Sequence, residues 1–226
     1  MKIFVVDTET TGFEPNKETL IEVAGVVYDT TTETILESYQ TLLYATSNAA
    51  QHVNNIKPEA LKLMSQDQKI NAKELMEAMA EDCDAVVAHN AKFDKDFLEH
   101  NQIDLGKPWV CSWTDITYPN AGKSKKLGHL CYDHGVPVLT AHSALHDVYI
   151  LIELFKKVPD LDKQLKKAGE PKDTYVAQVG FENKDAAKEK GFRWNPAKKL
   201  WTKEVRQSEA EELIKGAGFK IQKLEK

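Results

Sequence analysis

The sequence predicts an α/β protein with a mixed sheet, followed by a second, small α+β domain. Strand-like segments come first and then alternate with helical ones, which is the order expected of an α/β domain. After a polar stretch containing Gly and Pro, the pattern of short strands and helices starts again. With 226 residues, 42% of them hydrophobic, the chain is long enough for one large core and a small second domain.

The first domain is expected to open with antiparallel strands. Residues 2–6 are a short apolar run typical of a buried strand, and β-rich segments follow at residues 20–28 and 34–43 across a turn-like segment. Helical periodicity and one further apolar strand then alternate at residues 71–83 (helix), 85–88 (strand), 93–100 (helix), 126–134 (helix) and 143–158 (helix). Because the strand at 85–88 follows a helical crossover, we expect it to pair in parallel.

The second domain is expected to have βαββαβ order. Residues 159–173 are polar and charged and predict a linker, with room for one short helix. A strand, a helix, a hairpin at residues 192–205, a last helix and a last strand follow it. We therefore place one domain at residues 1–158 and a small α+β domain at residues 174–226.

Charge is unevenly divided along the chain. Residues 1–170 hold 17 Lys and Arg against 26 Asp and Glu, a net charge of −9, whereas residues 171–226 hold 13 against 9, a net charge of +4. Clustered acids can serve metal ions and a basic excess can serve phosphates, so the division suits a nucleic-acid enzyme. A solvated charged surface is the alternative interpretation.

The N-terminal residues and the cysteines indicate the compartment. Only four apolar residues separate Lys2 from Asp7, too few for a signal peptide or a membrane span, so we expect a cytoplasmic protein without membrane contact. The three cysteines show no zinc-type spacing and are expected to be free thiols.

A pair of carboxylates follows the first predicted strand. Asp7 and Glu9 lie two residues apart, and the period of a strand directs both to the same face. Two adjacent anions resist ionisation unless a cation lies between them, so the pair indicates a site for a hard divalent metal. Taken alone, such a short motif is more often surface charge.

Two further segments carry acids and a histidine at helix starts. Asp94 ends the segment HNAKFD, and the segment HSALHD contains His142 and Asp147. Histidine exchanges protons near neutral pH, which suits a general base in hydrolysis. Taken alone, Asp94 is explained by a favourable acid in the first helical turn, and the third segment is better explained by a histidine at a helix start followed by a solvated acid.

The three segments DTETTG, HNAKFD and HSALHD, in this order, resemble the three motifs of the DEDDh superfamily of 3′→5′ exonucleases. The resemblance covers about residues 1–158 and implies an RNase H-like mixed five-stranded sheet flanked by helices. It further implies hydrolysis of DNA from the 3′ end, release of nucleoside 5′-monophosphates, and two Mg²⁺ ions that Mn²⁺ can replace. Single-stranded 3′ ends and a role in DNA repair fit such an enzyme.

The resemblance also assigns roles to single residues. Asp7, Glu9, Asp94 and Asp147 would hold the metal ions, and His142 would take the proton from the attacking water. Three residues flanking the motifs are candidates for holding the terminal nucleotide: Thr10, Phe13 and Asn90. Phe13 can stack on a base, although it is equally suited to a core.

The C-terminal domain has its own candidate nucleic-acid contacts. Residues 191–201 interleave aromatic and basic side chains and resemble the ARWD-type module of some bacterial nucleic-acid enzymes. We expect Arg193, Lys198 and Lys199 to help hold DNA while the tryptophans pack inside the domain. A purely structural role for the aromatic residues is the alternative, because so small a domain has few other core residues.

Two alternative functions stay open at this point. An RNA 3′ exonuclease of the RNase T type would use the same metal site, because the site does not contact the 2′-hydroxyl. A proofreading subunit would act with a polymerase or another protein partner. A catalytically inactive binding module is disfavoured because all five catalytic positions are filled. A bacterial or a phage genome would encode such a chain.

Overall fold

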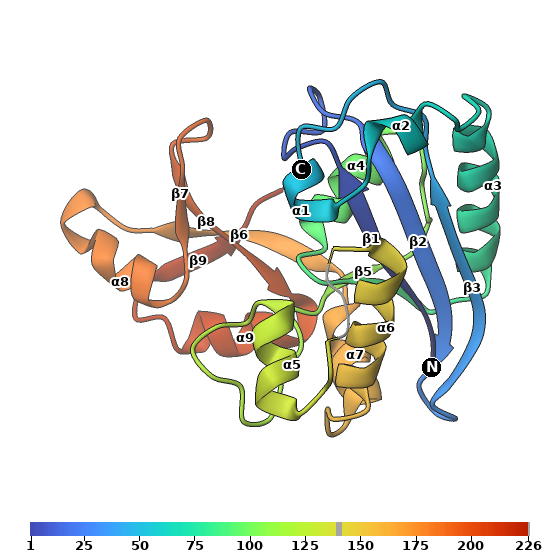
Figure 1. Ribbon diagram of the computed structural model, residues 1–226. Helices are drawn as coiled ribbons and strands as arrows, with labels where there is room; N and C mark the ends of the chain where they lie inside the picture. The colour runs from blue at the N-terminus through green and yellow to red at the C-terminus, as the bar shows by residue number, and fades with distance from the viewer. Residues whose placement is uncertain (139–141, 226) are drawn as a thin grey trace. The chain divides into compact units, whose positions relative to one another are not determined.

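The computed structural model describes residues 1–138 and 142–225. The chain forms two compact units, Met1–Gly169 and Glu170–Lys226, and each is described by itself (Figure 1).

The first unit is built on a mixed five-stranded sheet in the order β3-β2-β1-β4-β5. Its strands are β1 (Lys2–Thr10), β2 (Leu20–Asp29), β3 (Thr34–Leu42), β4 (Ala85–Ala88) and β5 (Trp109–Cys111). The first three strands pair antiparallel, and β1, β4 and β5 pair in parallel. The mixed five-stranded sheet predicted from the sequence is therefore confirmed.

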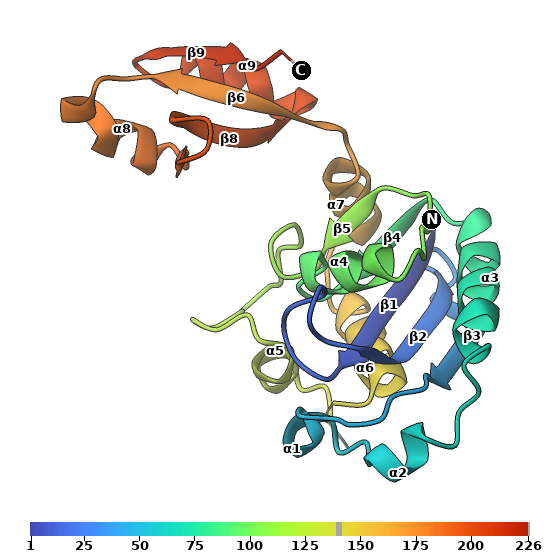
Figure 2. The same cartoon turned by 90° about the horizontal axis from the view of Figure 1, so that it is seen from above.

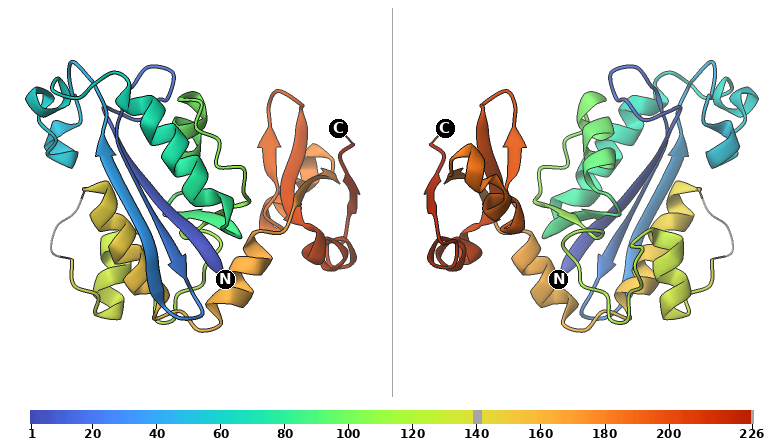
Figure 3. Two further views of the ribbon diagram at one scale, coloured as in Figure 1. Left: turned by 90° about the vertical axis from the view of Figure 1, so that its right-hand side faces the viewer. Right: turned by 90° about the vertical axis from the view of Figure 1, so that its left-hand side faces the viewer.

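Helices cover both faces of this sheet. Along β1, Ile3 and Val5 belong to the core beneath α6, whereas Phe4 and Val6 belong to the core beneath α3 and α4, so the strand is buried on both sides. Figures 1 and 3 show the sheet between α3 and α4 on one side and α5 and α6 on the other. These helices are α3 (Gln68–Glu81), α4 (Lys92–His100), α5 (Leu127–His134) and α6 (Ala144–Phe155).

Three elements of the first unit go beyond the sequence prediction: α1 (Gln51–Asn54), α2 (Pro58–Leu61) and β5. They have three or four residues, too few for hydrophobic periodicity to be visible. Helix α7 (Leu161–Ala168) is the one short helix for which the expected linker had room, and its Leu165 and Ala168 are buried in the core beneath α6.

The second unit is an antiparallel four-stranded sheet in the order β7-β8-β6-β9, with the βαββαβ order predicted for it. Its elements are β6 (Lys172–Gln178), η1 (Phe181–Asn183), α8 (Lys184–Glu189), β7 (Arg193–Asn195), β8 (Leu200–Arg206), α9 (Gln207–Lys215) and β9 (Lys220–Lys223) (Figure 2). Residues of both helices meet Tyr175, Ala177 and Val205 in one small core.

The expectation that both tryptophans pack inside the second unit is wrong for Trp194. Trp201 is partly buried and packs against the core, but 49% of Trp194 is exposed. The reason is that β7 is the edge strand of the sheet, outside β8, so its side chains lie beyond the cover of the helices.

No helix within the described parts of the chain combines the length and the apolar character that a membrane crossing requires.

Candidate active site

Strand β1 directs the two predicted carboxylates toward α6. Ile3 and Val5 face the core beneath α6, and the period of two carries Asp7 and Glu9 along the same row past the end of that core. Both side chains are partly buried. The sheet thus places two acids toward the carboxyl end of its central strand, where the core ends and solvent begins.

The opposite face of β1 holds Asp94. Thr8, which continues the row toward α4, is buried, and its Oγ1 donates a hydrogen bond of 2.8 Å to Oδ1 of Asp94. Asp94 lies in the first turn of α4 and is only 2% exposed. This hydrogen bond joins β1, which carries the first motif, to α4, which carries the acid of the second motif, directly beside Asp7 and Glu9.

The third motif closes the site from α6. Asp147 lies in the first turn of this helix, and the backbone N–H of His142 donates to its Oδ2 at 3.2 Å. One ligand atom from each of Glu9, His142 and Asp147 lies within 4.8 Å of the others. His142 has a φ of +62°, a left-handed conformation that is rare for non-glycine residues and concentrates at functional sites.

The four carboxyl groups of the site have raised pKa values because they lie close together and are shielded from solvent. Burial and the neighbouring charges, Asp94 first among them, raise the pKa of Asp7 well above its usual value. Burial and then the charge of Glu22 raise the pKa of Glu9 to about 8. Burial raises the pKa of Asp94 to about 7 against the opposing hydrogen bond from Thr8, and burial also raises the pKa of Asp147.

This donor set fits a hard divalent cation. Carboxylate oxygens are the ligands of Mg²⁺ and Mn²⁺, and a cation between them would offset the burial and the mutual repulsion that raise these pKa values. Asp7, Glu9, Asp94 and Asp147 supply the carboxylates, with the imidazole of His142 beside two of them. The arrangement can hold a metal ion against a phosphate and offer a proton acceptor next to it.

Glu22 is a site residue that the sequence analysis missed. It is paired with Glu9 across β1 and β2 and is 4% exposed. Its Oε2 accepts a hydrogen bond of 2.9 Å from the backbone N–H of Ala144, the first residue of α6, and its Oε1 accepts one of 2.5 Å from Gln40. The available signal was an acid within an otherwise apolar strand, because a buried carboxylate needs partners.

A hollow of about 410 Å³ adjoins the acids. Its lining comes from the end of β1, the loop that follows it, α1 and α4: Thr8, Glu9, Thr10, Thr11, Gly12, Phe13, Glu14, Glu18, Ala49, Ala50, His52, Val53, Asn54 and Phe93. Thr10 and Phe13 thus lie where the sequence predicted them, with Phe13 87% exposed rather than in a core. Asn90, with a φ of +70°, is exposed just before α4 and is outside this lining.

The loop beyond β1 is fixed in place by hydrogen bonds. Asn54 of α1 donates to the backbone oxygen of Thr10 at 3.2 Å, and Thr11 donates to Glu18 at 2.6 Å. A Cβ on Gly12 would meet the carboxyl carbon of Glu18 at 2.6 Å, so a larger residue there would require the Glu18 side chain to move. No sequence motif marked α1, since its contact with the site depends on the tertiary fold.

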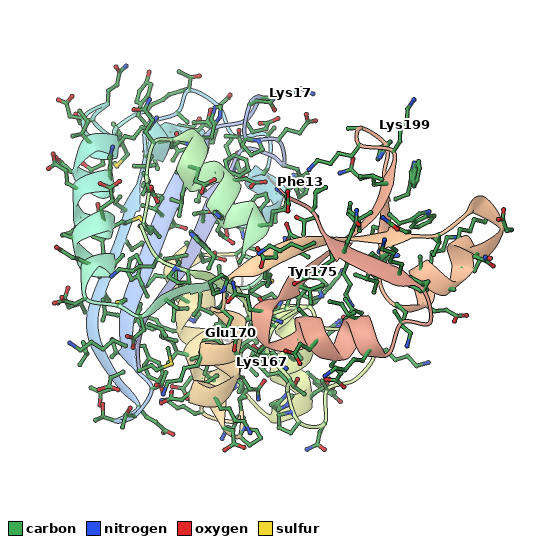
Figure 4. The ribbon with its side chains drawn as sticks, turned by 180° about the vertical axis from the view of Figure 1, so that it is seen from behind. Phe13, Lys17, Lys167, Glu170, Tyr175 and Lys199 are labelled. Carbon is green, nitrogen blue, oxygen red and sulfur yellow. The ribbon has the colours of Figure 1, made fainter. Side chains whose placement is uncertain are left out.

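The remaining predicted contact residues, Arg193, Lys198 and Lys199, belong to the second unit. All three are exposed along the hairpin of β7 and β8, where Figure 4 labels Lys199, and Lys199 has a φ of +52°.

The sheet, the clustered acids and the adjoining hollow define a nuclease that hydrolyses phosphodiester bonds. The chain belongs to the exonuclease family typified by RNase T, whose profile matches residues 4–155. Dependence on a divalent metal ion is a property of this family, and the acidic cluster agrees with it.

Individual proteins show the same similarity. The chain is 27% identical to DNA polymerase III subunit epsilon of Treponema pallidum in an alignment of 165 positions that covers 66% of this chain and 72% of that protein. A zinc-bound complex of E. coli exonuclease I with single-stranded DNA superposes with a TM-score of 0.61 and 17% identity, over 80% of this chain. A further exonuclease I structure superposes with a TM-score of 0.61 and 14% sequence identity, and the match covers 96% of this chain and 67% of that one.

The match to exonuclease I in the DNA complex covers only part of that protein. The chain spans about half, 48%, of exonuclease I in the DNA complex, and at this identity the likeness concerns the fold. The second unit matches a family described as a domain of unknown function (DUF8626), over residues 173–220. The expected ARWD-type resemblance of this unit is not among these findings.

Proposed function

We propose that this chain is a Mg²⁺-dependent 3′→5′ exodeoxyribonuclease that removes nucleoside 5′-monophosphates from single-stranded DNA ends. The observation that carries the proposal is the convergence of Asp7 and Glu9, Asp94, and Asp147 with His142 from three separate segments near the carboxyl end of the central strand β1. Membership of the exonuclease family supports the reaction, and the names of the similar proteins support DNA as the substrate.

The four carboxylates Asp7, Glu9, Asp94 and Asp147 would hold the metal ions. Bound divalent ions supply electrostatic stabilisation of the negative charge that develops on the phosphate and lower the pKa of water. The hard oxygen ligands favour Mg²⁺, with Mn²⁺ as a substitute.

His142 is the proton acceptor of the proposed reaction. The water oxygen forms a bond to phosphorus, the bond from phosphorus to the 3′ oxygen of the preceding nucleotide breaks, and the imidazole takes the proton of the water. The exposed side chain of His142 lies beside Glu9 and Asp147, so a water molecule can reach it from solvent. The backbone hydrogen bond from His142 to Asp147 holds the base close to the acids.

The hollow beside the acids would hold the terminal nucleotide. Its volume of about 410 Å³ is within the range of small-molecule sites, about 300–1,000 Å³. Phe13 and Phe93 supply aromatic surface for stacking on a base, and Thr10 lines the same hollow. Asn90 would act from outside this lining, at the start of α4.

A proofreading role beside a polymerase is the second candidate function. The observation in its favour is the 27% identity with DNA polymerase III subunit epsilon, which covers 72% of that subunit. Under this alternative the same residues carry the chemistry, and a protein partner delivers the 3′ end.

Labelled-end digestion tests the proposed function. The native chain is incubated with single-stranded DNA, duplex DNA and RNA, each labelled at the 3′ or the 5′ end, in the presence of Mg²⁺. We expect the 3′ label to be released at once as a mononucleotide and the 5′-labelled strand to shorten stepwise, fastest for single-stranded DNA. Faster digestion of RNA would reassign the substrate, and early release of the 5′ label would contradict the polarity.

A further inference from the structure

The second unit presents a rigid aromatic pair at its sheet edge. Trp194 of β7 is paired directly with Trp201 of β8, so both side chains lie on the same face, and their ring centroids are 5.6 Å apart at an interplanar angle of 59°. Trp201 packs against the core, whereas 49% of Trp194 is exposed. The inner ring therefore packs against one side of the outer ring, and the rest of the outer ring is open to solvent.

Trp194 is exposed because it lies on the edge strand β7, and its exposure leaves aromatic surface uncovered. Burial of the exposed part of this side chain would stabilise so small a domain, because each Å² of apolar surface removed from water contributes about 25 cal/mol. The hairpin is nevertheless held in place, because β7 pairs antiparallel with β8 and Oδ1 of Asn195 accepts a hydrogen bond of 3.0 Å from the backbone N–H of Lys198. The exposed part of the Trp194 ring is therefore carried on an ordered hairpin, where a planar group can stack on it.

One basic side chain lies near the pair, and three more belong to the same hairpin. The Nζ of Lys188 lies 6.0 Å from the ring centroid of Trp201, and it also pairs with Asp185 at 2.8 Å. Exposed Arg193, Lys198 and Lys199 belong to the same hairpin as the tryptophans. We call this set the Trp194 surface: Arg193, Trp194, Lys198, Lys199, Trp201 and Lys188.

A shallow hollow of about 220 Å³ adjoins the Trp194 surface. Trp194, Lys199 and Trp201 line it together with Gln178 and Gln222, which offer amide donors and acceptors. Its volume is below the roughly 300 Å³ at which pockets for separate small ligands begin. The hollow therefore suits the partial entry of one planar group that belongs to a larger ligand.

We propose that the Trp194 surface binds a single-stranded segment of the nucleic acid whose 3′ end is digested, with one base stacked on Trp194. Residues 171–226 carry a net charge of +4, whereas residues 1–170 carry −9, so the second unit is the part of the chain that complements a polyanion. Aromatic rings interleaved with cations are the combination by which proteins hold single strands regardless of sequence. The inference rests on the proposed function for the identity of the ligand.

Binding measured without hydrolysis tests the inference. The full-length chain in EDTA is titrated into a fluorescein-labelled single strand of about 16 nucleotides, the upper site size of single-strand modules. Trp194→Ala should weaken binding about tenfold, the effect of losing one stacked base. Tyr132→Ala is the matched control, because Tyr132 is also an exposed aromatic residue, at 87%, but belongs to α5 of the first unit.

Salt dependence separates the basic residues from the stacking residue. Replacing Lys198 and Lys199 together with Ala should lower the slope of log affinity against log salt by about 1.4, since each phosphate contact to a single strand contributes about 0.7. Lys215→Ala in α9 should lower it less. Trp194→Ala should leave this slope unchanged, because stacking releases no counterions.

Two results would overturn the inference. Equal affinity of the native chain and Trp194→Ala for the labelled single strand of about 16 nucleotides, with matching thermal unfolding, would exclude stacking at this surface. Equal loss in Tyr132→Ala would show that the effect is not specific. Failure of the proposed function is seen separately, as absence of mononucleotide release by the native chain from a trinucleotide in Mg²⁺, which reports on the catalytic site alone.

Discussion

The carboxylate of Glu22 accepts a hydrogen bond of 2.9 Å from the backbone N–H of Ala144 and thereby ties strand β2 to the first residue of α6. The same strand pairs with β1 opposite Glu9, and the same helix carries Asp147 in its first turn. One buried side chain therefore fixes the distance between the acids of the sheet and the acid of the helix.

Replacing Glu22 with Ala should reduce kcat about a hundredfold, because a displacement of the catalytic groups by about 1 Å has that effect. It should also lower the free energy of unfolding by about 1–3 kcal/mol, since the backbone N–H of Ala144 and the amide of Gln40 lose their acceptor. Steady-state kinetics should show KM changing much less than kcat.

The control is Glu22→Gln, which keeps an acceptor oxygen for Ala144 and lets the Gln40 amide rotate to accept a hydrogen bond. The kcat of Glu22→Gln should therefore stay much closer to that of the native chain than the kcat of Glu22→Ala. Equal kinetics of the two variants would show that geometry at Ala144 is not the cause.

The stability of the metal-free chain should fall as the pH rises from about 4 to about 8. Folding raises the pKa of Glu9 to about 8 and that of Asp94 to about 7, whereas unfolded carboxyl groups titrate near about 4. In this interval the folded chain binds more protons than the unfolded chain, so the free energy of unfolding decreases with pH. Urea unfolding in EDTA at several pH values measures the effect.

Asp94→Asn should remove part of this pH dependence and raise the stability of the metal-free chain near pH 8. The Asn oxygen can still accept the hydrogen bond from Thr8, so folding should be preserved. Adding Mg²⁺ should stabilise the native chain more than the variant, because the cation binds the ionised acids. A variant whose stability follows the same pH curve as the native chain would contradict the assignment.

Two histidines of the third motif provide a matched pair. His142→Ala should lower kcat by about a hundredfold to ten-thousandfold, the usual contribution of a general base. His146→Ala should retain activity within about tenfold, because His146 lies on α6 outside the described group formed by Glu9, His142 and Asp147. Similar losses in both variants would remove the distinct role of His142.

Phe13→Ala should raise KM for single-stranded DNA about tenfold, because stacking on an aromatic side chain contributes about 1–3 kcal/mol per base. Phe13 is 87% exposed, so thermal unfolding should be unaffected. Leu63→Ala, which removes an equally exposed apolar side chain at 81%, is the control. An unchanged KM would place the terminal base elsewhere.

The sheet and the acids were predictable because each depends on local pattern. The period of two in β1 determined that Asp7 and Glu9 share a face, and the apolar run at Ala85–Ala88 marked a central strand. The contribution of Glu22 was not predictable, since its hydrogen bond joins residues 122 positions apart in the chain. That Asn54 lines the hollow beside the acids was not predictable either, since it depends on where the fold places α1.

The second unit shows a different limit of sequence reasoning. Its strand and helix order was predictable from turns and alternation, but the burial of its tryptophans was not. Trp194 and Trp201 are the same residue type and both lie among basic residues in the sequence, and the position of β7 at the edge of the sheet makes their burial different.

The measurement that tests the central claim most directly is the release of mononucleotide from 3′-labelled single-stranded DNA by the native chain and by Asp147→Asn, with Mg²⁺ or with EDTA. Rapid release by the native chain in Mg²⁺, abolished both by EDTA and by the substitution, is the predicted result. Equal release in EDTA, or full activity of a folded Asp147→Asn variant, would contradict the assignment of these acids as the metal-binding catalytic site.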